Sequence, residues 1–221
     1  EQLGADEQYD AVIVDDGQDI HDLWWTSIDE LFKDPSNKGC YYVFFDPNQN
    51  LFVENPSLPA ELGTPFDLPM NCRNTVRIAG HCASLVGQEN HTREGAPIGD
   101  EPEMITVSSL NDGFREAGKR VRNWCMPNAG GLKNSQVAVL APGRTERSWP
   151  RDFNTVPATK SLDNWRENGG VLISSWGRFK GLEADAIIII ETETSDDPHE
   201  VAARYVARSR AKHLLTVVQV G

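Results

Sequence analysis

Positive charge, paired cysteines and long apolar runs are all scarce in this sequence. It has 21 Lys and Arg against 33 Asp and Glu, a formal net charge of −12, which argues against a general nucleic-acid wrapper but permits a local basic groove. The four cysteines are widely spaced without a C-x-x-C pair, so free thiols in a reducing cytoplasm are favoured over metal or redox chemistry. The apolar runs, such as Ala186 to Ile190, are all far too short to span a bilayer. We therefore expect a cytoplasmic protein without a membrane partner.

A phosphate-binding loop is also missing, because the pattern G-x-x-x-x-G-K-[ST] occurs nowhere in the 221 residues. Neither an initiator Met nor a signal-peptide pattern stands at Glu1, and we expect the chain to be part of a longer protein. With 39% hydrophobic and 24% charged residues the composition is that of a globular protein. The length allows one large domain, or one domain plus part of another.

Apolar runs alternate with helix-like stretches, which predicts an α/β fold with a parallel sheet and helices on both faces. Because most of the runs are continuously apolar, both sheet faces are expected to be covered. The predicted strands are Ala11–Val14, Tyr41–Phe45, Val137–Leu140, Val171–Ser174, Ala186–Ile190 and Leu214–Val220. The predicted helices are Asp22–Phe32, Thr75–Val86, Ser109–Cys125 and His199–Ser209.

Three segments lack this regularity. Asp46–Pro69 is rich in Pro, Asn and Gly, which indicates a connector and a domain boundary near residue 65. Gln88–Pro102 has the composition of a surface loop, and Pro142–Asn168 is expected to form a small irregular insertion. The predicted domains are therefore 1–65 and 66–221.

Acidic and amide side chains follow the first two predicted strands. Asp15 and Asp16 end the first strand, where one carboxylate can hold Mg²⁺ through water while its neighbour orients an attacking water. The structural alternative is a helix cap at Asp19 or Asp22, and the motif alone does not decide between the two. Asp46-Pro-Asn-Gln49 follows the second strand and either places a phosphate-sensing amide or forms a simple turn.

Basic residues recur in three later blocks. Arg73 precedes a helix and offers a planar fork for phosphate oxygens, although a solvated Arg is the commoner case. The loop from Ser174 to Glu183 concentrates hydroxyl, basic and glycine residues suited to phosphate or nucleic-acid backbone. The block Arg204–Lys212 ends a helix, where cations either stabilise the helix dipole or include an arginine finger.

These five blocks, taken in order, resemble the superfamily-1 DNA helicases of the UvrD/Rep type, and the resemblance runs from about Tyr9 to Val218. Such helicases have two RecA-like, P-loop NTPase-type domains with ATP bound between them. The resemblance implies that residues 1–65 are the last part of the first domain and that 66–221 are most of the second. The implied ligands are ATP, Mg²⁺ and single-stranded or partly duplex DNA, together with the missing N-terminal helicase domain as a partner.

The resemblance also implies roles for residues around the nucleotide. Asp15 looks like the magnesium-associated acid, and Asp16 stands where the family usually has the Glu that activates water. Arg73 and Arg210 resemble the two arginines that reach the terminal phosphate, and Arg210 is the implied arginine finger. Glu183 is similar to the acid that contacts the ribose.

Further residues of the same blocks complete the implied sites. Gln18 and Gln49 look like nucleotide-state sensors, and Gly181 allows close approach of the cofactor. The nucleic-acid-binding candidates are Ser175, Trp176 and Arg178, with Phe52 as a second aromatic for stacking on bases, although core aromatics are commoner.

Four departures from the family pattern stand out. Asp16 is one methylene shorter than Glu, Cys72 replaces an aromatic that stacks on adenine, and Gly177 replaces a His. The stretch between Arg73 and Ser174 leaves no room for the large inserted subdomain of the UvrD type, so a compact relative is expected.

Three interpretations follow. The first is the C-terminal part of an ATP-dependent DNA helicase or translocase, in which this chain alone would not hydrolyse ATP because it lacks the phosphate loop. The second is a degenerate, non-catalytic helicase-like module that binds nucleic acid or a protein partner. The third is another RecA-like nucleotide-binding protein, against which the final Arg-Ser-Arg-Ala-Lys block argues. Translocation polarity, DNA or RNA preference and oligomeric state have no signal in the sequence.

Overall fold

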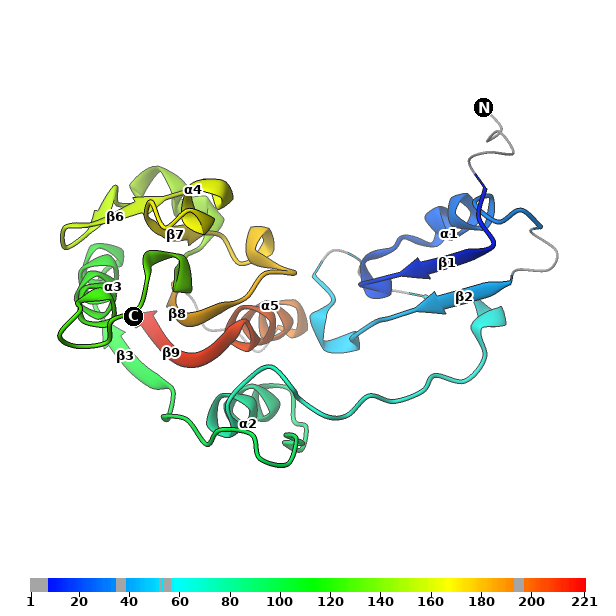
Figure 1. Cartoon of the computed structure of the whole chain (residues 1–221), viewed down its shortest axis with the longest axis horizontal. Coiled ribbons are helices and arrows are strands. Elements are labelled where there is room, and N and C mark those ends of the chain that lie inside the picture. The colour runs from blue at the N-terminus through cyan, green and yellow to red at the C-terminus, as the bar shows by residue number, and fades with distance from the viewer. Residues whose placement is uncertain (1–7, 35–38, 52, 54–56, 193–196) are drawn as a thin grey trace. The chain divides into compact units, whose positions relative to one another are not determined.

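A computed structural model describes the chain except for residues 1–7, 35–38, 52, 54–56 and 193–196. The chain divides into two compact units, Glu1–Leu68 and Pro69–Gly221, which are called unit 1 and unit 2 below (Figure 1). The boundary between the two units lies between Leu68 and Pro69. The composition of the sequence had placed it near residue 65. Among the described residues, no helix has the length and apolar character needed to cross a membrane.

Unit 2 is built on a seven-stranded sheet in the order β3-β9-β8-β4-β7-β6-β5. All neighbouring pairs are parallel except β5 with β6. The strands are β3 (Glu103–Val107), β4 (Val137–Leu140), β5 (Asp152–Phe153), β6 (Val156–Thr159), β7 (Val171–Ser174), β8 (Ala184–Glu191) and β9 (Ala211–Val220).

Helices cover both faces of this sheet. Alternate residues of each central strand point to opposite sides, so Ala138 and Leu140 join one core cluster while Val137 and Val139 join the other. The first cluster packs under α2 (Val76–Leu85), α4 (Leu162–Arg166) and α5 (Pro198–Ser209), and the second under α3 (Leu110–Cys125). Unit 2 is therefore a three-layer α/β fold with a mostly parallel sheet, consistent with a RecA-like domain, and the fold class predicted from the sequence is confirmed.

Unit 1 is much smaller. Strands β1 (Ala11–Val14) and β2 (Cys40–Val43) form a parallel pair, accompanied by α1 (Asp22–Asp29). Short 3-10 helices η2 (Gly17–Asp19) and η3 (Pro47–Gln49) follow the two strands, and η4 (Ala60–Leu62) lies further along the chain. Ile13 and Tyr42 remain 68% and 59% exposed, so the expectation that both sheet faces are covered is wrong for unit 1, where one helix accompanies the two strands.

The predicted strands and helices of unit 2 are all present, with ends that differ by a few residues. Strand β3 was not predicted, and neither were the elements within Pro142–Asn168. That segment contains η6 (Gly143–Ser148), β5, β6 and α4, and β6 pairs with β7. The expectation of an irregular insertion there is wrong, because the segment supplies one edge of the sheet. The other 3-10 helices are η5 (Asn134–Gln136) and η7 (Gly177–Phe179).

Candidate functional site

The acids that follow β1 lie at a strained turn. Asp16 has φ 53°, in the left-handed region, and the backbone N–H of Asp16 donates to Asp15 Oδ1 at 3.0 Å. Asp tolerates this backbone better than most residues, since its short polar side chain bonds locally. The turn gives a conformational reason for Asp at a position where the resembling family has Glu. Asp15 is exposed directly beyond the strand, as expected for a carboxylate presented at a strand end.

A hydrogen-bond chain joins the carboxyl ends of β1 and β2. Gln18, only 1% exposed, donates from Nε2 to Asp16 Oδ1 at 2.9 Å and accepts at Oε1 from the backbone N–H of Asp46 at 3.0 Å. Asp46 in turn accepts from Asn48 N at 2.9 Å and from Gln49 Nε2 at 2.8 Å. The structure thus brings Asp16, Gln18 and Gln49 together through Asp46, which follows the carboxyl end of β2.

These carboxylates do not form a closed metal cage. Among the described residues, no group of three or more His, Cys, Asp or Glu side chains is arranged to hold a metal ion. An exposed strand-end carboxylate such as Asp15 suits a cation whose remaining ligands are water and phosphate, as Mg²⁺ prefers.

In unit 2 one carboxylate joins two cations from distant parts of the chain. Glu183 Oε2 accepts from Arg73 Nε at 3.0 Å across 110 residues, and Glu183 Oε1 lies 2.7 Å from Lys212 Nζ. The hydrogen bonds from Lys212 and from Arg73 hold the pKa of Glu183 below its ordinary value although partial burial opposes them. All three side chains remain partly exposed, so the cluster is accessible to a ligand.

Asn74 and Thr75 hold the segments of this cluster in register. The Asn74 side-chain amide donates to the backbone oxygens of Ser209 at 2.9 Å and Ala211 at 2.5 Å. The backbone N–H of Thr75 donates to Lys212 O at 3.1 Å, and the Thr75 side chain caps α2. Buried polar bonds therefore fix the start of α2 against the junction of α5 and β9.

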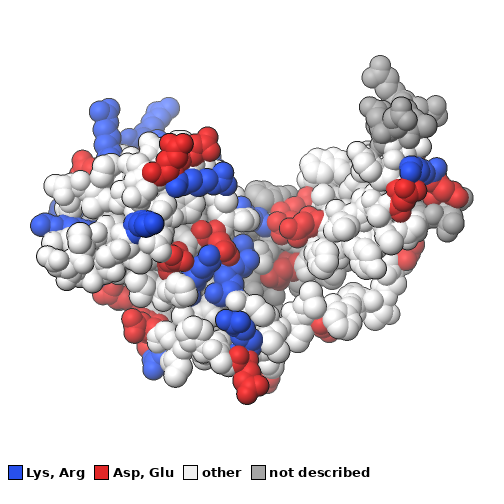
Figure 2. All heavy atoms as spheres, in the orientation of Figure 1, with Lys and Arg blue, Asp and Glu red and all other residues white. Residues whose placement is uncertain are grey.

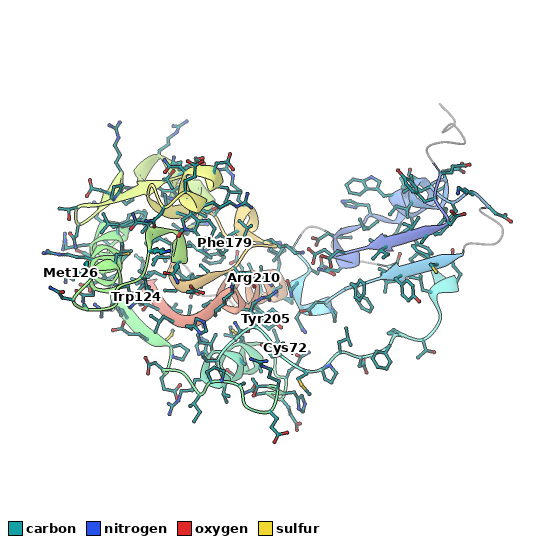
Figure 3. The ribbon with its side chains drawn as sticks, viewed as in Figure 1. Cys72, Trp124, Met126, Phe179, Tyr205 and Arg210 are labelled. Carbon is teal, nitrogen blue, oxygen red and sulfur yellow. The ribbon has the colours of Figure 1, made fainter. Side chains whose placement is uncertain are left out.

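Arg210 lies at that junction but is turned inward. It is 4% exposed, and its guanidinium donates to Val206 O at 3.2 Å and to Ser209 Oγ at 3.4 Å. The backbone oxygen of Arg210 accepts from Ala184 N at 3.2 Å, which ties this position to the start of β8 next to Glu183. Figure 3 shows Arg210 at the end of α5 and Cys72, which is exposed, in the loop that leads to α2.

Gly181 has φ +78°, and a Cβ placed on it would meet nothing within 4 Å. The positive φ explains why a glycine stands at this position, because residues with a side chain rarely adopt it. A close neighbouring atom is not the reason. The role in cofactor approach that the resemblance implied is neither required nor contradicted by this geometry.

The nucleic-acid-binding candidates lie at the opposite edge of the sheet. Ser175 directly follows the carboxyl end of β7, whereas Glu183 directly precedes the amino end of β8, and the connection between them buries Phe179. Arg178 is exposed and its NH1 lies 3.3 Å from Glu146 Oε2. Trp176 is half-buried against the core, with an Nε1 that has no partner among the described residues. The predicted stacking residue Phe52 lies outside the described residues.

Sequence reasoning missed two charged residues that the fold places beside Arg178. Glu146 and Lys160 give no local motif signal, and only the fold brings Glu146 next to Arg178 and Lys160. Gly177, which replaces a His of the resembling family, has open space where a side chain would stand.

Comparisons with known proteins give a resemblance of fold and no match to a family or a curated protein. No protein-family model matches the chain, and no curated protein matches it. Among solved structures, the chain is similar to the C-terminal domain of a possible DNA helicase from Lactobacillus plantarum WCFS1, at 21% identity and a TM-score of 0.49. The match covers 68% of this chain and 88% of that one. A likeness of this size says nothing about activity or ligands.

Proposed function

We propose that the chain is the C-terminal part of an ATP-dependent DNA helicase or translocase of the superfamily-1 UvrD/Rep type. The observation that supports this most directly is the meeting of Arg73, Glu183 and Lys212 at one edge of the unit 2 sheet. These residues come from three of the five blocks on which the resemblance rests, and 110 residues separate the first two. Their separation in sequence makes chance assembly a poor explanation.

In this proposal unit 2 supplies cations and a ribose contact to ATP held between two RecA-like domains. Arg73 and Arg210 neutralise charge on the transferred phosphate, and Glu183 binds the ribose. Because Glu183 already holds Arg73 and Lys212, the cluster is preorganised for a charged ligand. Arg210 is buried against its own helix, so its arginine-finger role requires the guanidinium to leave Val206 O.

Unit 1 contributes the nucleotide-sensing side in the same proposal. Asp15 holds Mg²⁺ through water, Asp16 orients the attacking water, and Gln18 and Gln49 respond to the terminal phosphate. The hydrogen-bond chain through Asp46 gives such a response a route between the two strand ends. Closure on ATP and reopening after hydrolysis would move single-stranded DNA past Ser175, Trp176 and Arg178.

The decisive experiment measures DNA-stimulated ATPase activity in a gene product that carries this chain together with a phosphate-loop domain. Arg73→Ala is the preferred variant because Arg73 is exposed, and it is expected to abolish stimulation while leaving the melting temperature unchanged. Arg77→Ala, an exposed Arg in the next turn paired with Glu101, is the matched control. Equal activity in the two variants would remove Arg73 from the phosphate site. The isolated chain is expected not to hydrolyse ATP.

A second candidate function is a degenerate module that binds nucleic acid or a protein partner without catalysis. It is favoured by the shortened acid at Asp16 and by the open space at Gly177, where the resembling family has a His. An intact phosphate-loop parent without ATPase activity, but with retained DNA binding, would support this candidate over the motor.

A further inference from the structure

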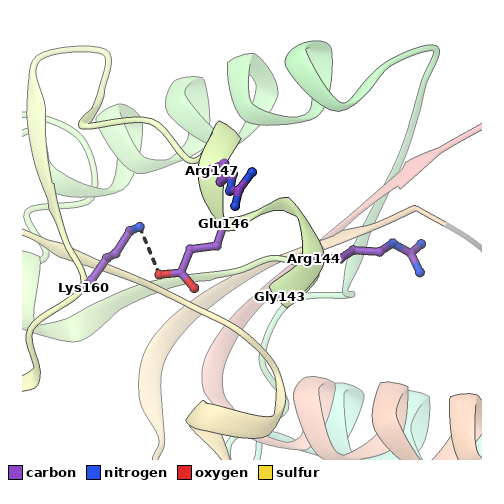
Figure 4. Close-up of a pocket in the computed structure, with 5 residues that line it drawn as sticks. All are labelled: Gly143, Arg144, Glu146, Arg147 and Lys160. Carbon is purple, nitrogen blue, oxygen red and sulfur yellow. Dashed lines mark hydrogen bonds and ion pairs between the residues drawn. The ribbon is translucent and has the colours of Figure 1, made fainter.

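A hollow of about 550 Å³ lies on unit 2 beside η6 and has no role in the proposed nucleotide site. It is lined by Gly143, Arg144, Glu146, Arg147 and Lys160 (Figure 4). Its volume falls within the range of ordinary small-ligand sites, about 300–1,000 Å³. None of these residues belongs to a block that the sequence had assigned to nucleotide or nucleic acid.

The surroundings of the hollow lie at the carboxyl edge of the sheet. Segment η6 follows β4, Lys160 follows β6, and Arg178 lies in the connection that follows β7. Arg144 NH2 donates at 2.8 Å to Thr192 Oγ1, which follows β8. The strands β6, β7, β4 and β8 are adjacent and parallel. Open α/β sheets bind ligands in the crevice beyond the carboxyl ends of their strands. The position of the hollow is therefore that of a ligand-binding site.

The charge around the hollow is opposite to that of the chain as a whole. Arg144, Arg147, Lys160 and Arg178 surround one carboxylate, Glu146, on a chain with a net charge of −12. On the face of unit 2 that Figure 2 shows, Lys and Arg are interspersed with Asp and Glu. A local excess of cations on an acidic protein attracts anions and is not a by-product of overall composition.

Segment η6, which supplies four of the five lining residues, is held by a buried tryptophan. Trp149 is buried, donates from Nε1 to Thr145 Oγ1 at 3.0 Å, and has Lys160 Nζ 5.3 Å from a ring centroid. Thr145 Oγ1 also donates to Pro142 O at 2.6 Å, which braces η6. Arg144 and Arg147 are therefore carried on a braced segment, as a binding site requires.

The Glu146 carboxylate is paired with two of these cations, Lys160 and Arg178. Its Oε1 lies 3.1 Å from Lys160 Nζ and its Oε2 lies 3.3 Å from Arg178 NH1. The hydrogen bond from Lys160 and the charge of Arg178 hold the pKa of Glu146 below its ordinary value, so this group is ionised at neutral pH. Arg147 is exposed and makes no hydrogen bond or ion pair with any described residue.

We propose that this hollow is a phosphate-binding site in which the Glu146 carboxylate is a built-in competitor of the ligand. A phosphate oxyanion binds Arg147 and Lys160, and displaces Glu146 from Lys160 and Arg178. The chemistry is that of a phosphate group, carried either by a nucleic-acid strand or by a free nucleotide. This assignment does not require that the chain works as part of a motor.

The test measures binding of a fluorescein-labelled oligothymidylate to the whole 221-residue chain by anisotropy, over a series of salt concentrations. Arg147→Ala is expected to weaken binding about fivefold or more and to reduce the slope of log K against log salt by about 0.7, as for one lost contact to a single strand. Lys160→Ala is expected to weaken binding in the same direction. Arg122→Ala, which removes an exposed Arg of α3 away from the hollow, is the control and is expected to bind like the unmodified chain.

The variant Glu146→Gln tests whether Glu146 competes with the ligand or only supports the structure. Removing its charge is expected to strengthen binding several-fold at the same salt concentration, whereas a merely structural Glu146 would leave binding unchanged or weaken it. Thermal melting of each variant checks that the fold is intact, since these ion pairs are largely exposed.

Competition then identifies the source of the phosphate. Displacement of the labelled strand by ATP or inorganic phosphate would assign the site to a free phosphate, and displacement only by unlabelled oligothymidylate would assign it to a nucleic-acid backbone. Absence of strand and phosphate binding, or equal binding by the Arg147→Ala, Lys160→Ala and Arg122→Ala chains, would overturn the proposal. A missing ATPase activity in the parent protein would leave it standing.

Discussion

The guanidinium of Arg208 closes on the carboxylate of Glu191 inside unit 2. Arg208 NH2 lies 2.8 and 2.9 Å from the two Glu191 oxygens, and Nε lies 3.1 Å from Oε1. Both side chains are almost fully buried. Arg208 NH1 also lies 2.8 Å from His81 Nε2, so α2, β8 and α5 meet through one guanidinium. This pair therefore links three elements of the unit 2 core through a single buried ion pair.

Breaking this buried pair is expected to be costly. Glu191→Gln leaves the Arg208 charge uncompensated in the interior, and we expect the free energy of unfolding to fall by about 3–5 kcal/mol in urea titrations. The control is Glu101→Gln, which breaks the exposed pair with Arg77 and is expected to cost about 1 kcal/mol or less. Similar losses in the two variants would mean that Arg208 has other compensation.

The His81 imidazole makes the stability of unit 2 depend on pH. Burial, and then the charge of Arg208, lower the pKa of His81 from its ordinary value of 6.5, while Glu101 acts weakly in the opposite sense. The unfolded chain therefore takes up this proton at a higher pH than the native chain does. We expect the stabilising contribution to be present above pH 6.5 and to be lost as the pH falls below it.

Urea unfolding at pH 7.5 and pH 5.5 measures this dependence. His81→Gln is expected to reduce the difference between the two pH values, and His213→Gln, which changes an exposed His, is expected to leave it unchanged. An undiminished pH dependence in His81→Gln would assign the effect to other groups.

Gln18 is expected to be the structural link between the strand ends of unit 1. Gln18→Leu keeps the volume but removes the acceptor of the Asp46 N–H, and an unpaired buried donor costs about 1–3 kcal/mol. Hydrogen exchange is the direct measurement, because the Asp46 amide should lose protection. Gln49→Leu, which leaves that backbone bond intact, is the control. Unchanged protection in Gln18→Leu would show that the chain of bonds does not hold the strand ends.

Two glycines of one loop are expected to respond in opposite ways. Gly181→Ala forces a side chain into a backbone with φ +78° and is expected to cost about 1–2 kcal/mol. Gly177→His enters open space and is expected to change stability by about 0.5 kcal/mol or less. If the neighbouring Ser175 and Arg178 bind nucleic acid, the new His should also raise oligonucleotide affinity. Equal melting temperatures for the two variants would contradict the backbone argument.

The strands that could be predicted from the sequence are those that form continuous apolar runs, whether they are fully buried or, like Ala11–Val14, partly exposed. Val137–Leu140 and Val171–Ser174 are continuous apolar runs, and both were located to the residue. Strand β3 begins with Glu103 and is partly exposed, and β6 contains Pro157, so neither has the signal of a buried strand. Their strand conformation depends on pairing with β9 and with β7.

The residues of the candidate sites also differ in how far the sequence predicts them. Asp15, Arg73 and Glu183 could be nominated because each stands in a short block whose residue types suit phosphate or metal. The pairing of Glu183 with Arg73 and Lys212 could not be predicted, and neither could that of Glu146 with Lys160, since these residues are far apart in the sequence. A charged side chain acquires its role from the opposite charges that the fold brings within about 4 Å.

What the sequence by itself determined is the class of fold, because continuous apolar runs indicate strands wherever they stand in the chain. Only the tertiary structure decided which charges face one another: Glu183 with Arg73 and Lys212 at one edge of the sheet, and Glu146 with Lys160 and Arg178 at the other. The physical reason is that apolar burial follows local pattern, whereas electrostatic pairing depends on distances that only the folded chain creates.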